Sequence, residues 1–160
     1  FSIGRKPRRW KWLEDLPLRR EVGTSLYVHG SPRDERNEYI LETDVIFEDT
    51  NKLQEIYEQV EHVLFIGHSH APLVITDDLD CWKPGDNNGP FVMENDRKYI
   101  VNVGSVGQPR DGDNRACYAL VQGPEIQHVR VSYDYQATME KVKKMGPISI
   151  AAAVRLELGR

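Results

Sequence analysis

The sequence predicts a mixed α/β (α+β) protein, in which one βαβ unit leads into a series of antiparallel strands. Two apolar runs, at 24–30 and 62–67, flank a segment at 50–60 that has helical periodicity. Further short apolar runs follow, and turn-forming residues separate them. Strand, helix and strand in this order form a βαβ unit. The sheet is therefore expected to be mixed, with parallel strands first and antiparallel strands after them.

The amino-terminal part predicts two helices and one strand. A short helix is expected at 8–15, before a proline. The run "TSLYVHG" at 24–30 predicts a strand with a turn behind it. The polar segment 31–39 predicts a loop. The helix at 50–60 is amphipathic, because its apolar residues recur at i, i+3, i+4 and i+7. These residues are Leu53, Ile56, Tyr57 and Val60.

The remainder predicts strands and then two helices. The near-continuous apolar run at 62–67 is typical of a strand buried on both faces. Further strands are expected at 71–76, 91–95, 98–106, 115–123 and 126–134. The last of these alternates apolar and polar residues, which indicates one solvent-facing side. Helices are expected at 136–144 and after Gly146–Pro147.

Composition excludes several classes of protein. The chain has 160 residues, 39% of them apolar and 29% charged, as is ordinary for one globular domain. The formal net charge of −4 disfavours nucleic acid as the main partner. No apolar run approaches the roughly 20 residues that span a membrane. Two cysteines, Cys81 and Cys117, are too few for a disulfide scaffold, and a cytoplasmic location is expected.

Three histidines form a candidate metal site. His29 and His68 each stand where an apolar strand gives way to glycine. Parallel strands would bring both to the carboxyl edge of the sheet, where ligands bind in open α/β sheets. In extended backbone, His68 and His70 would project to the same side. Three imidazoles could then converge at metal–nitrogen distances of roughly 2.0–2.1 Å. The alternative is an ordinary polar loop.

Two other histidines are expected to be structural. His62 follows the amphipathic helix, where an imidazolium would interact favourably with the helix dipole. His128 lies in the alternating strand at 126–134, with no partner nearby in sequence.

The segment "VNVGSVGQPRDGDNRACYAL" contains a candidate phosphate site. Gly104 and the neighbouring Ser105 lie in a glycine-rich turn that lets backbone N–H groups approach an anion. Arg110 could make a forked contact to phosphate. The alternative is a plain loop that carries a surface arginine.

Taken together, "LYVHGSPRD", "FIGHSHAP" and "VNVGSVGQPRDGDNRACYAL" resemble the calcineurin-like metallophosphoesterases, in their branch of small prokaryotic phosphodiesterases and phosphatases. The resemblance covers about residues 10–131, and the tail "GPISIAAAVRLELG" is similar too. It implies a β-sandwich flanked by helices, with two divalent transition metals (Mn, Fe, Zn or Ni) at the strand ends. His29 and His68 would bind one metal and His70 the other. A hydroxide bridging the metals would attack a phosphomonoester or phosphodiester in line.

The resemblance is to the carboxyl-terminal half of that family only. The expected Asp-x-His, Gly-Asp and Gly-Asn-His segments are missing, because Gly85–Asp86 and Gly112–Asp113 lie in turns rather than after strands. We therefore expect residues 1–160 to be one domain, the carboxyl-terminal part of a phosphoesterase domain, and to be inactive alone. The start at Phe1 instead of methionine agrees with this expectation.

Two alternatives remain open. The chain could be a non-catalytic scaffold or protein-interaction module that keeps the phosphoesterase fold. It could also be a complete small protein with a mononuclear three-histidine site, although half a sandwich would expose an apolar sheet face. The expected partners are a phosphoester substrate and either a chain carrying the amino-terminal half or a second copy.

Overall fold

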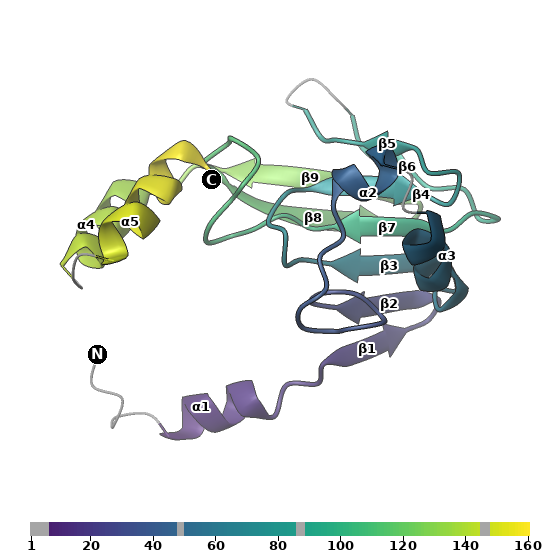
Figure 1. Ribbon diagram of the computed structural model, residues 1–160, viewed down its shortest axis with the longest axis horizontal. Helices are drawn as coiled ribbons and strands as arrows, with labels where there is room; N and C mark the ends of the chain where they lie inside the picture. The colour runs from purple at the N-terminus through teal and green to yellow at the C-terminus, as the bar shows by residue number, and fades with distance from the viewer. Residues whose placement is uncertain (1–6, 48–49, 86–88, 145–147) are drawn as a thin grey trace.

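Two β-sheets stacked on each other form the body of the protein, and helices lie against one face and at both ends of the chain (Figure 1). This computed structural model describes residues 7–47, 50–85, 89–144 and 148–160. The predicted class is confirmed, since the fold is mixed α/β with two sheets flanked by helices.

The larger sheet has six strands in the order β1-β2-β3-β7-β4-β5. Strands β2, β3 and β7 run parallel, while β1, β4 and β5 pair antiparallel to their neighbours. This confirms the βαβ unit, in which helix α3 (Thr50–Glu58) connects β2 to β3. The strand bounds are Arg19–Val22 (β1), Ser25–Val28 (β2), Val63–Ile66 (β3), Leu73–Thr76 (β4), Cys81–Trp82 (β5) and Tyr99–Asn102 (β7).

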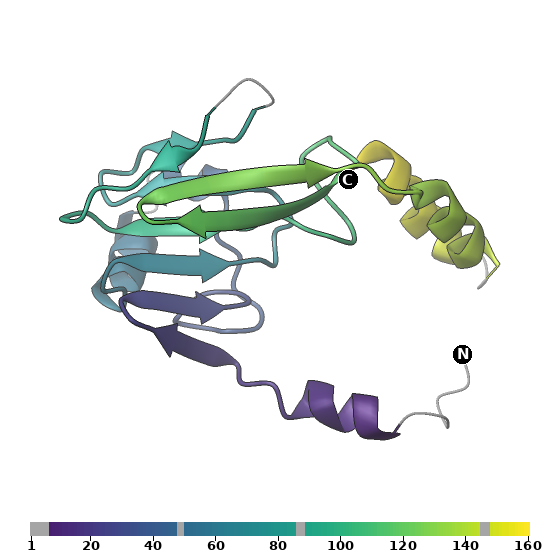
Figure 2. The same cartoon turned by 180° about the vertical axis from the view of Figure 1, so that it is seen from behind.

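The smaller sheet is antiparallel and covers part of one face of the larger one (Figure 2). Its order is β6-β9-β8, with bounds Phe91–Val92 (β6), Ala116–Gln122 (β8) and Glu125–Val131 (β9). Ile126 of β9 is fully buried among apolar side chains of the larger sheet. Those side chains are Val63, Phe65, Val74, Tyr99 and Val101.

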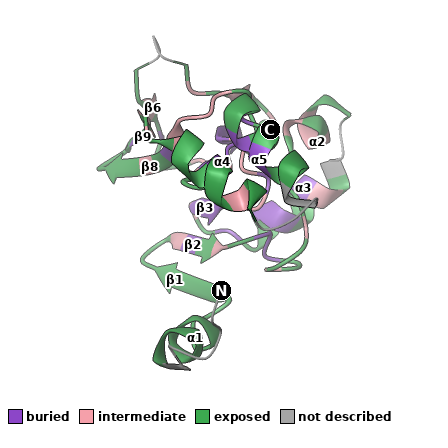
Figure 3. Ribbon diagram, turned by 90° about the vertical axis from the view of Figure 1, so that its left-hand side faces the viewer, coloured by how far each residue is buried: buried purple, intermediate pink, exposed green. Residues whose placement is uncertain are grey.

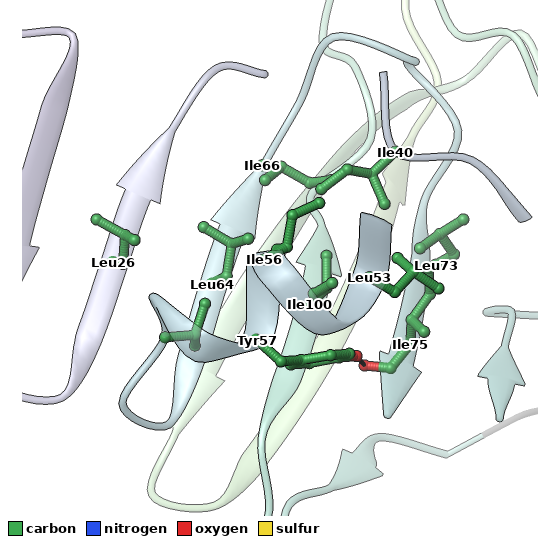
Figure 4. Packing of buried hydrophobic residues seen from close by; sticks show 11 residues of the cluster. Leu26, Ile40, Leu53, Ile56, Tyr57, Leu64, Ile66, Leu73, Ile75 and Ile100 are labelled. Atoms are coloured by element: carbon green, nitrogen blue, oxygen red, sulfur yellow. Dashed lines mark hydrogen bonds between the residues drawn. The ribbon is translucent and has the colours of Figure 1, made fainter. Parts of the chain in front are cut away.

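Helix α3 covers the opposite face of the larger sheet (Figure 4). Its predicted stripe is buried against β2, β3, β4 and β7, and the Tyr57 hydroxyl donates a hydrogen bond of 2.9 Å to the Ile75 carbonyl. Because both faces are covered, every residue of β3, β4 and β7 is buried. The near-continuous apolar run predicted this burial correctly.

Three short elements were not expected. Strand β1 is exposed along its whole length, and its sequence "RREV" has no apolar face. It forms because a turn at Gly23 folds it back onto β2. Helix α2 (Glu42–Ile46) and the two-residue strand β5 are too short to show periodicity. Such elements depend on tertiary contacts rather than on their own sequence pattern.

The terminal helices project from the body of the molecule. Helices α4 (Tyr135–Lys143) and α5 (Ile148–Leu158) pack on each other through Met139, Ala153 and Leu156. They are otherwise mostly exposed (Figure 3), as is α1 (Pro7–Glu14). The helices predicted at 8–15 and 136–144 therefore form within one residue of their expected bounds, α3 ends two residues before its expected end, and α5 follows Gly146–Pro147, which lies outside the described residues. None of the helices that the structure describes is long and apolar enough to cross a membrane.

The prediction that His62 lies at the helix dipole is wrong. Helix α3 ends at Glu58, and the His62 ring instead contacts the Arg97 carbonyl oxygen through Nδ1 at 2.7 Å. The cation at the end of the helix is Lys98, whose Nζ donates to the Tyr57 carbonyl at 2.7 Å. His62 is structural, as expected, but through a different contact.

Candidate functional site at the carboxyl edge of the parallel strands

His29 and His68 meet at the carboxyl edge of the larger sheet. Each follows a parallel strand, β2 and β3, and the Gly67 N–H donates to the His29 carbonyl at 3.0 Å. His29 Nε2 and His68 Nδ1 lie 3.0 Å apart, with the rings edge to face at a centroid separation of 4.8 Å. The topology inferred from sequence therefore places these two histidines together, as predicted.

The segment between Gly67 and His70 is a tight turn, not the extended backbone that was expected. His68 and His70 have φ angles of 58° and 60°, in the left-handed region, and the Ser69 N–H donates to the Gly67 carbonyl at 2.6 Å. Positive φ is uncommon for residues other than glycine, and strained backbone concentrates at functional sites. His70 consequently turns toward the Gln108 carbonyl, which lies 2.7 Å from its Nδ1.

Asn102 holds this turn in place. Its side chain is fully buried at the end of β7, where Nδ2 donates to the Gly67 carbonyl at 2.6 Å and to Ser69 Oγ at 2.8 Å. Its Oδ1 accepts from the Gly104 N–H at 2.9 Å, and its carbonyl accepts from His128 Nε2 at 2.8 Å. Sequence reasoning missed this role. The available signal was a polar residue that ends an otherwise apolar strand, "YIVN".

The glycine-rich turn after β7 packs closely against Cys117. Gly104 has φ of 83°, and a Cβ added there would lie 2.7 Å from the Sγ of Cys117, which is a buried free thiol as expected. The Ser105 hydroxyl accepts from the backbone N–H groups of Gly107 and Gln108, at 3.3 and 3.0 Å. Phosphate binding by Gly104 and Ser105 stays a prediction, since the contacts described here organise the loop.

Arg110 lies directly beside the histidine turn. Its backbone N–H donates to the His70 carbonyl at 3.1 Å, and its side chain is exposed. The guanidinium Nη2 lies 3.4 Å from Gln108 Oε1, a long contact that leaves the group able to reorient. Its position agrees with the predicted phosphate contact, which stays a prediction.

A pocket of about 340 Å³ opens next to this turn. Apolar groups of Leu41, Pro72 and Leu73 line it, and its charged residues are the basic Lys83 and Arg110 and the acidic Glu42 and Asp111. Lys83 forms an ion pair of 2.5 Å with Glu42, which is also at the pocket. The pocket size falls within the range of small-molecule sites, about 300–1,000 Å³.

The surroundings of the His29 imidazole favour its neutral form. Burial lowers the pKa of His29 below its ordinary value, and positive charge on His68 or His70 would lower it further. Neutral imidazole is the form that binds metal ions.

The residues of this chain fit part of a metal site. Two imidazole nitrogens that share one tetrahedral zinc ion lie roughly 3.3–3.4 Å apart, given Zn–N distances of about 2.0–2.1 Å. The His29–His68 separation of 3.0 Å is close to this distance, and a small movement of either ring would reach it. However, across the described ranges no group of three or more His, Cys, Asp or Glu is arranged to hold an ion. The described residues therefore supply a pair of donors and do not complete a site.

Known proteins that resemble this chain share its fold and are longer than it is. No protein-family model matches the chain. It is 31% identical over 146 residues to the uncharacterized protein MJ0912 of Methanocaldococcus jannaschii, covering 87% of this chain and 55% of that protein. It is similar to the crystal structure of a metallophosphoesterase from Sphaerobacter thermophilus, with 32% identity and a TM-score of 0.77, over 94% of this chain and 62% of that one.

A hypothetical protein from Pyrococcus horikoshii shares the fold, with a TM-score of 0.61 at 19% identity over 89% of this chain and 52% of that chain. The chain thus spans between about half and five eighths of the proteins it matches. Its two sheets and helices correspond to part of a metallophosphoesterase fold.

Proposed function

We propose that this chain is part of the catalytic domain of a metallophosphoesterase, and that it supplies histidine ligands for hydrolysis of phosphomonoesters or phosphodiesters. The observation that carries the proposal is the His29–His68 pair, whose nitrogens lie 3.0 Å apart at the carboxyl edge of parallel strands. The 32% identity to a metallophosphoesterase over 94% of the chain supports it.

In this proposal each residue has a distinct task. His29 and His68 hold one divalent transition metal (Mn, Fe, Zn or Ni), and His70 holds a second. When bound, such ions lower the pKa of water and neutralise charge on phosphoryl oxygens. Arg110 binds a phosphoryl oxygen, and the pocket beside it receives the group esterified to phosphate. The carboxylate and asparagine ligands come from a segment or chain outside these 160 residues, in the same cytoplasmic protein or assembly.

A non-catalytic scaffold is the second candidate. It is favoured by the absence, among the residues that the structure describes, of a group of three or more metal-binding side chains. A scaffold would keep the two-sheet fold and use the carboxyl edge as an interaction surface.

Metal binding and hydrolysis separate the two candidates. The test uses the longest protein that the reading frame around this chain encodes, titrated with Mn²⁺ and assayed with a bis-aryl phosphodiester. We expect Asp-x-His, Gly-Asp and Gly-Asn-His upstream, and His68→Gln to weaken Mn²⁺ binding by at least about tenfold and to abolish hydrolysis.

His62→Gln is the matched control, because His62 lies at the other end of the same strand, β3, and is tied to the Arg97 carbonyl. It should leave metal binding and hydrolysis unchanged. Hydrolysis that survives His68→Gln would refute the proposal. A protein that carries every ligand segment yet neither binds Mn²⁺ nor hydrolyses the diester would establish the scaffold.

A further inference from the structure

The loop from Gly30 to Tyr39 has a well-defined internal structure beside the histidines. The Gly30 N–H donates to the Glu35 carbonyl at 2.8 Å, and a Cβ at Gly30 would lie 2.6 Å from the Asp34 carbonyl oxygen. The Asp34 carboxylate accepts from the backbone N–H groups of Arg36 and Asn37 at 3.1 and 3.0 Å. These bonds lower the pKa of Asp34, because they favour its charged form.

The same loop is tied to helix α3. Arg33 Nη1 donates to Glu55 of that helix at 2.6 Å, and Arg33 Nη2 donates to Glu38 at 2.5 Å. The Ser31 hydroxyl, which is fully buried, also donates to the Glu38 carboxylate. Exposed ion pairs contribute little individually. Here several bonds converge on the Glu38 carboxylate, and Arg33 also connects the loop to helix α3.

The end of this loop contacts His68 in two ways. The Asn37 carbonyl oxygen lies 3.1 Å from His68 Nε2. The Tyr39 ring stacks on the His68 ring, with a centroid separation of 3.9 Å and an interplanar angle of 28°. His68 is therefore held at its far nitrogen and on one face, while its Nδ1 faces His29.

The carbonyl determines which nitrogen of His68 carries the proton. A carbonyl oxygen only accepts, so Nε2 must be the N–H that donates to it. In a neutral imidazole the other nitrogen then has the free lone pair, and at His68 this is Nδ1. His70 is the reverse case, because its Nδ1 lies 2.7 Å from the Gln108 carbonyl and must carry the hydrogen. The two histidines of one tight turn thus present different ring nitrogens.

We propose that the loop at 30–39 is a positioning element for His68. The Asn37 carbonyl selects the Nε2–H tautomer and the Tyr39 ring fixes the imidazole plane, so that Nδ1 is the atom with which His68 binds its metal ion. The metal-binding role rests on the proposed function. The tautomer and the ring position are properties of the metal-free protein. Partners of this kind typically change metal affinity by about 10–100-fold when they are mutated.

Long-range ¹H–¹⁵N NMR of the histidine rings tests the proposal without metal, in alkaline buffer where the imidazoles are neutral. The longest encoded protein, with the wild-type sequence, should show a single Nε2–H tautomer at His68 and a single Nδ1–H tautomer at His70. In Tyr39→Leu, the His68 signals should move toward a mixture of tautomers, while His70 stays unchanged. Tyr39→Phe keeps the stacked ring and should behave as wild type.

Tyr27→Leu is the matched control. Tyr27 is also a stacked tyrosine of nearly the same exposure (40% against 42% for Tyr39), but its ring lies on Phe65 at 4.9 Å. It should leave the His68 tautomer unchanged. Arg33→Gln provides a second, independent change, because it removes the ion pair between the loop and Glu55 of α3 without altering a residue that contacts His68, while the bond from Lys52 Nζ to the Tyr39 carbonyl remains. It should shift the His68 signals in the same direction as Tyr39→Leu.

Three results would overturn the inference: an Nδ1–H tautomer at His68 in the wild type, a mixture there, or a Tyr39→Leu spectrum identical to wild type. A Mn²⁺ titration of the longest encoded protein separates this failure from that of the proposed function. A single His68 tautomer in a protein that binds no Mn²⁺ would refute the proposed function. A mixed tautomer in a protein that binds Mn²⁺ would refute the positioning role alone.

Discussion

The two edges of the parallel strands carry the same residue type in opposite environments. At the amino edge, just before β3, the His62 ring bonds the Arg97 carbonyl at 2.7 Å and packs edge to face on Tyr99 at 5.7 Å. At the carboxyl edge, just after β3, His68 has a left-handed backbone and faces a second imidazole at 3.0 Å. His62 has relaxed contacts that stabilise the fold, whereas His68 is held in strained backbone by its neighbours. Both histidines lie at an end of the same strand, so the strand end does not tell their roles apart. Their surroundings distinguish the structural histidine from the candidate ligand.

The largest expected difference in stability is between variants at the two ends of strand β7, where Tyr99 begins the strand and Asn102 ends it. Asn102→Ala removes three side-chain hydrogen bonds and takes the Asn102 partner from the buried Ser69 hydroxyl and the buried Gly104 N–H, while the Gly67 carbonyl keeps its bond from the Ser69 N–H. Each buried unpaired group costs about 1–3 kcal/mol, so we expect a loss of about 3 kcal/mol in the free energy of unfolding, measured in urea. Tyr99→Phe removes one bond, from the Glu94 N–H, and should cost about 1 kcal/mol. Equal losses would show that Asn102 does not hold the turn.

The next largest loss of stability is expected at Gly104, in contrast to Gly107 in the same turn after β7. Gly104→Ala combines positive φ with a contact of 2.7 Å to Cys117, and overpacking of this kind costs about 1–3 kcal/mol. We expect the melting temperature to fall by several degrees. Gly107→Ala, with nothing within 4 Å of the added Cβ, should change it by less than about one degree. Adding Cys117→Ala removes only the Sγ contact, because the Cys117 Cβ would also lie 2.7 Å from the added Cβ, so most of the loss should remain. A loss in Gly104→Ala as small as that in Gly107→Ala would argue against the clash.

A smaller loss is expected at the amino edge. His62→Ala removes one hydrogen bond to the Arg97 carbonyl and one aromatic contact, worth about 1–2 kcal/mol together. The free energy of unfolding should fall by that amount while the NMR signals of His68 stay at their wild-type positions. Altered His68 signals would mean that the two edges are coupled through β3.

The smallest expected effect is a dependence of the free energy of unfolding on pH. His128 supports the carboxyl edge from the smaller sheet, and burial lowers its pKa below the ordinary 6.5, a shift that the bond to the Asn102 carbonyl opposes and Arg130 reinforces. Below pH 6.5 the unfolded chain therefore binds more protons than the folded one. Stability should decline as the pH falls from 6.5 and level off below the folded pKa.

Urea unfolding across this pH range measures the effect, and His128→Gln should remove that part of the slope. Asp34 and Asp113, whose pKa values are lowered by hydrogen bonds, act in a separate window that begins near 3.8. An unchanged slope in His128→Gln would show that other groups cause the decline.

Much of the fold could be predicted because its elements carry their own pattern. The stripe of Leu53, Ile56, Tyr57 and Val60 indicated α3, and the apolar run of β3 indicated a strand buried on both faces. Strand β1 and helix α2 could not be predicted, because one has no buried face and the other spans five residues. Their conformations depend on neighbours that are distant in sequence or on short turns.

The candidate site could be predicted only in outline. The parallel order of β2 and β3 follows from the pattern of the chain and brings His29 to His68. The left-handed turn could not be inferred, because it depends on Asn102, more than 30 residues further along the chain. Tyr39 lay in a segment expected to be an ordinary polar loop, and its stacking on His68 arises only when that loop folds back.

By itself, the sequence determined the mixed α/β class, the helix that covers the sheet and the strand ends at which histidines would gather. These three features depend on local periodicity and on the order of helices and strands, both of which can be seen in one sequence. The tertiary structure decided the geometry of the turn, the hydrogen-bonded Asn102 beneath it and the nitrogen that each histidine presents. Those features require buried polar groups to find partners across the fold, and the partners of a hydrogen bond are chosen by distance in space rather than by distance along the chain.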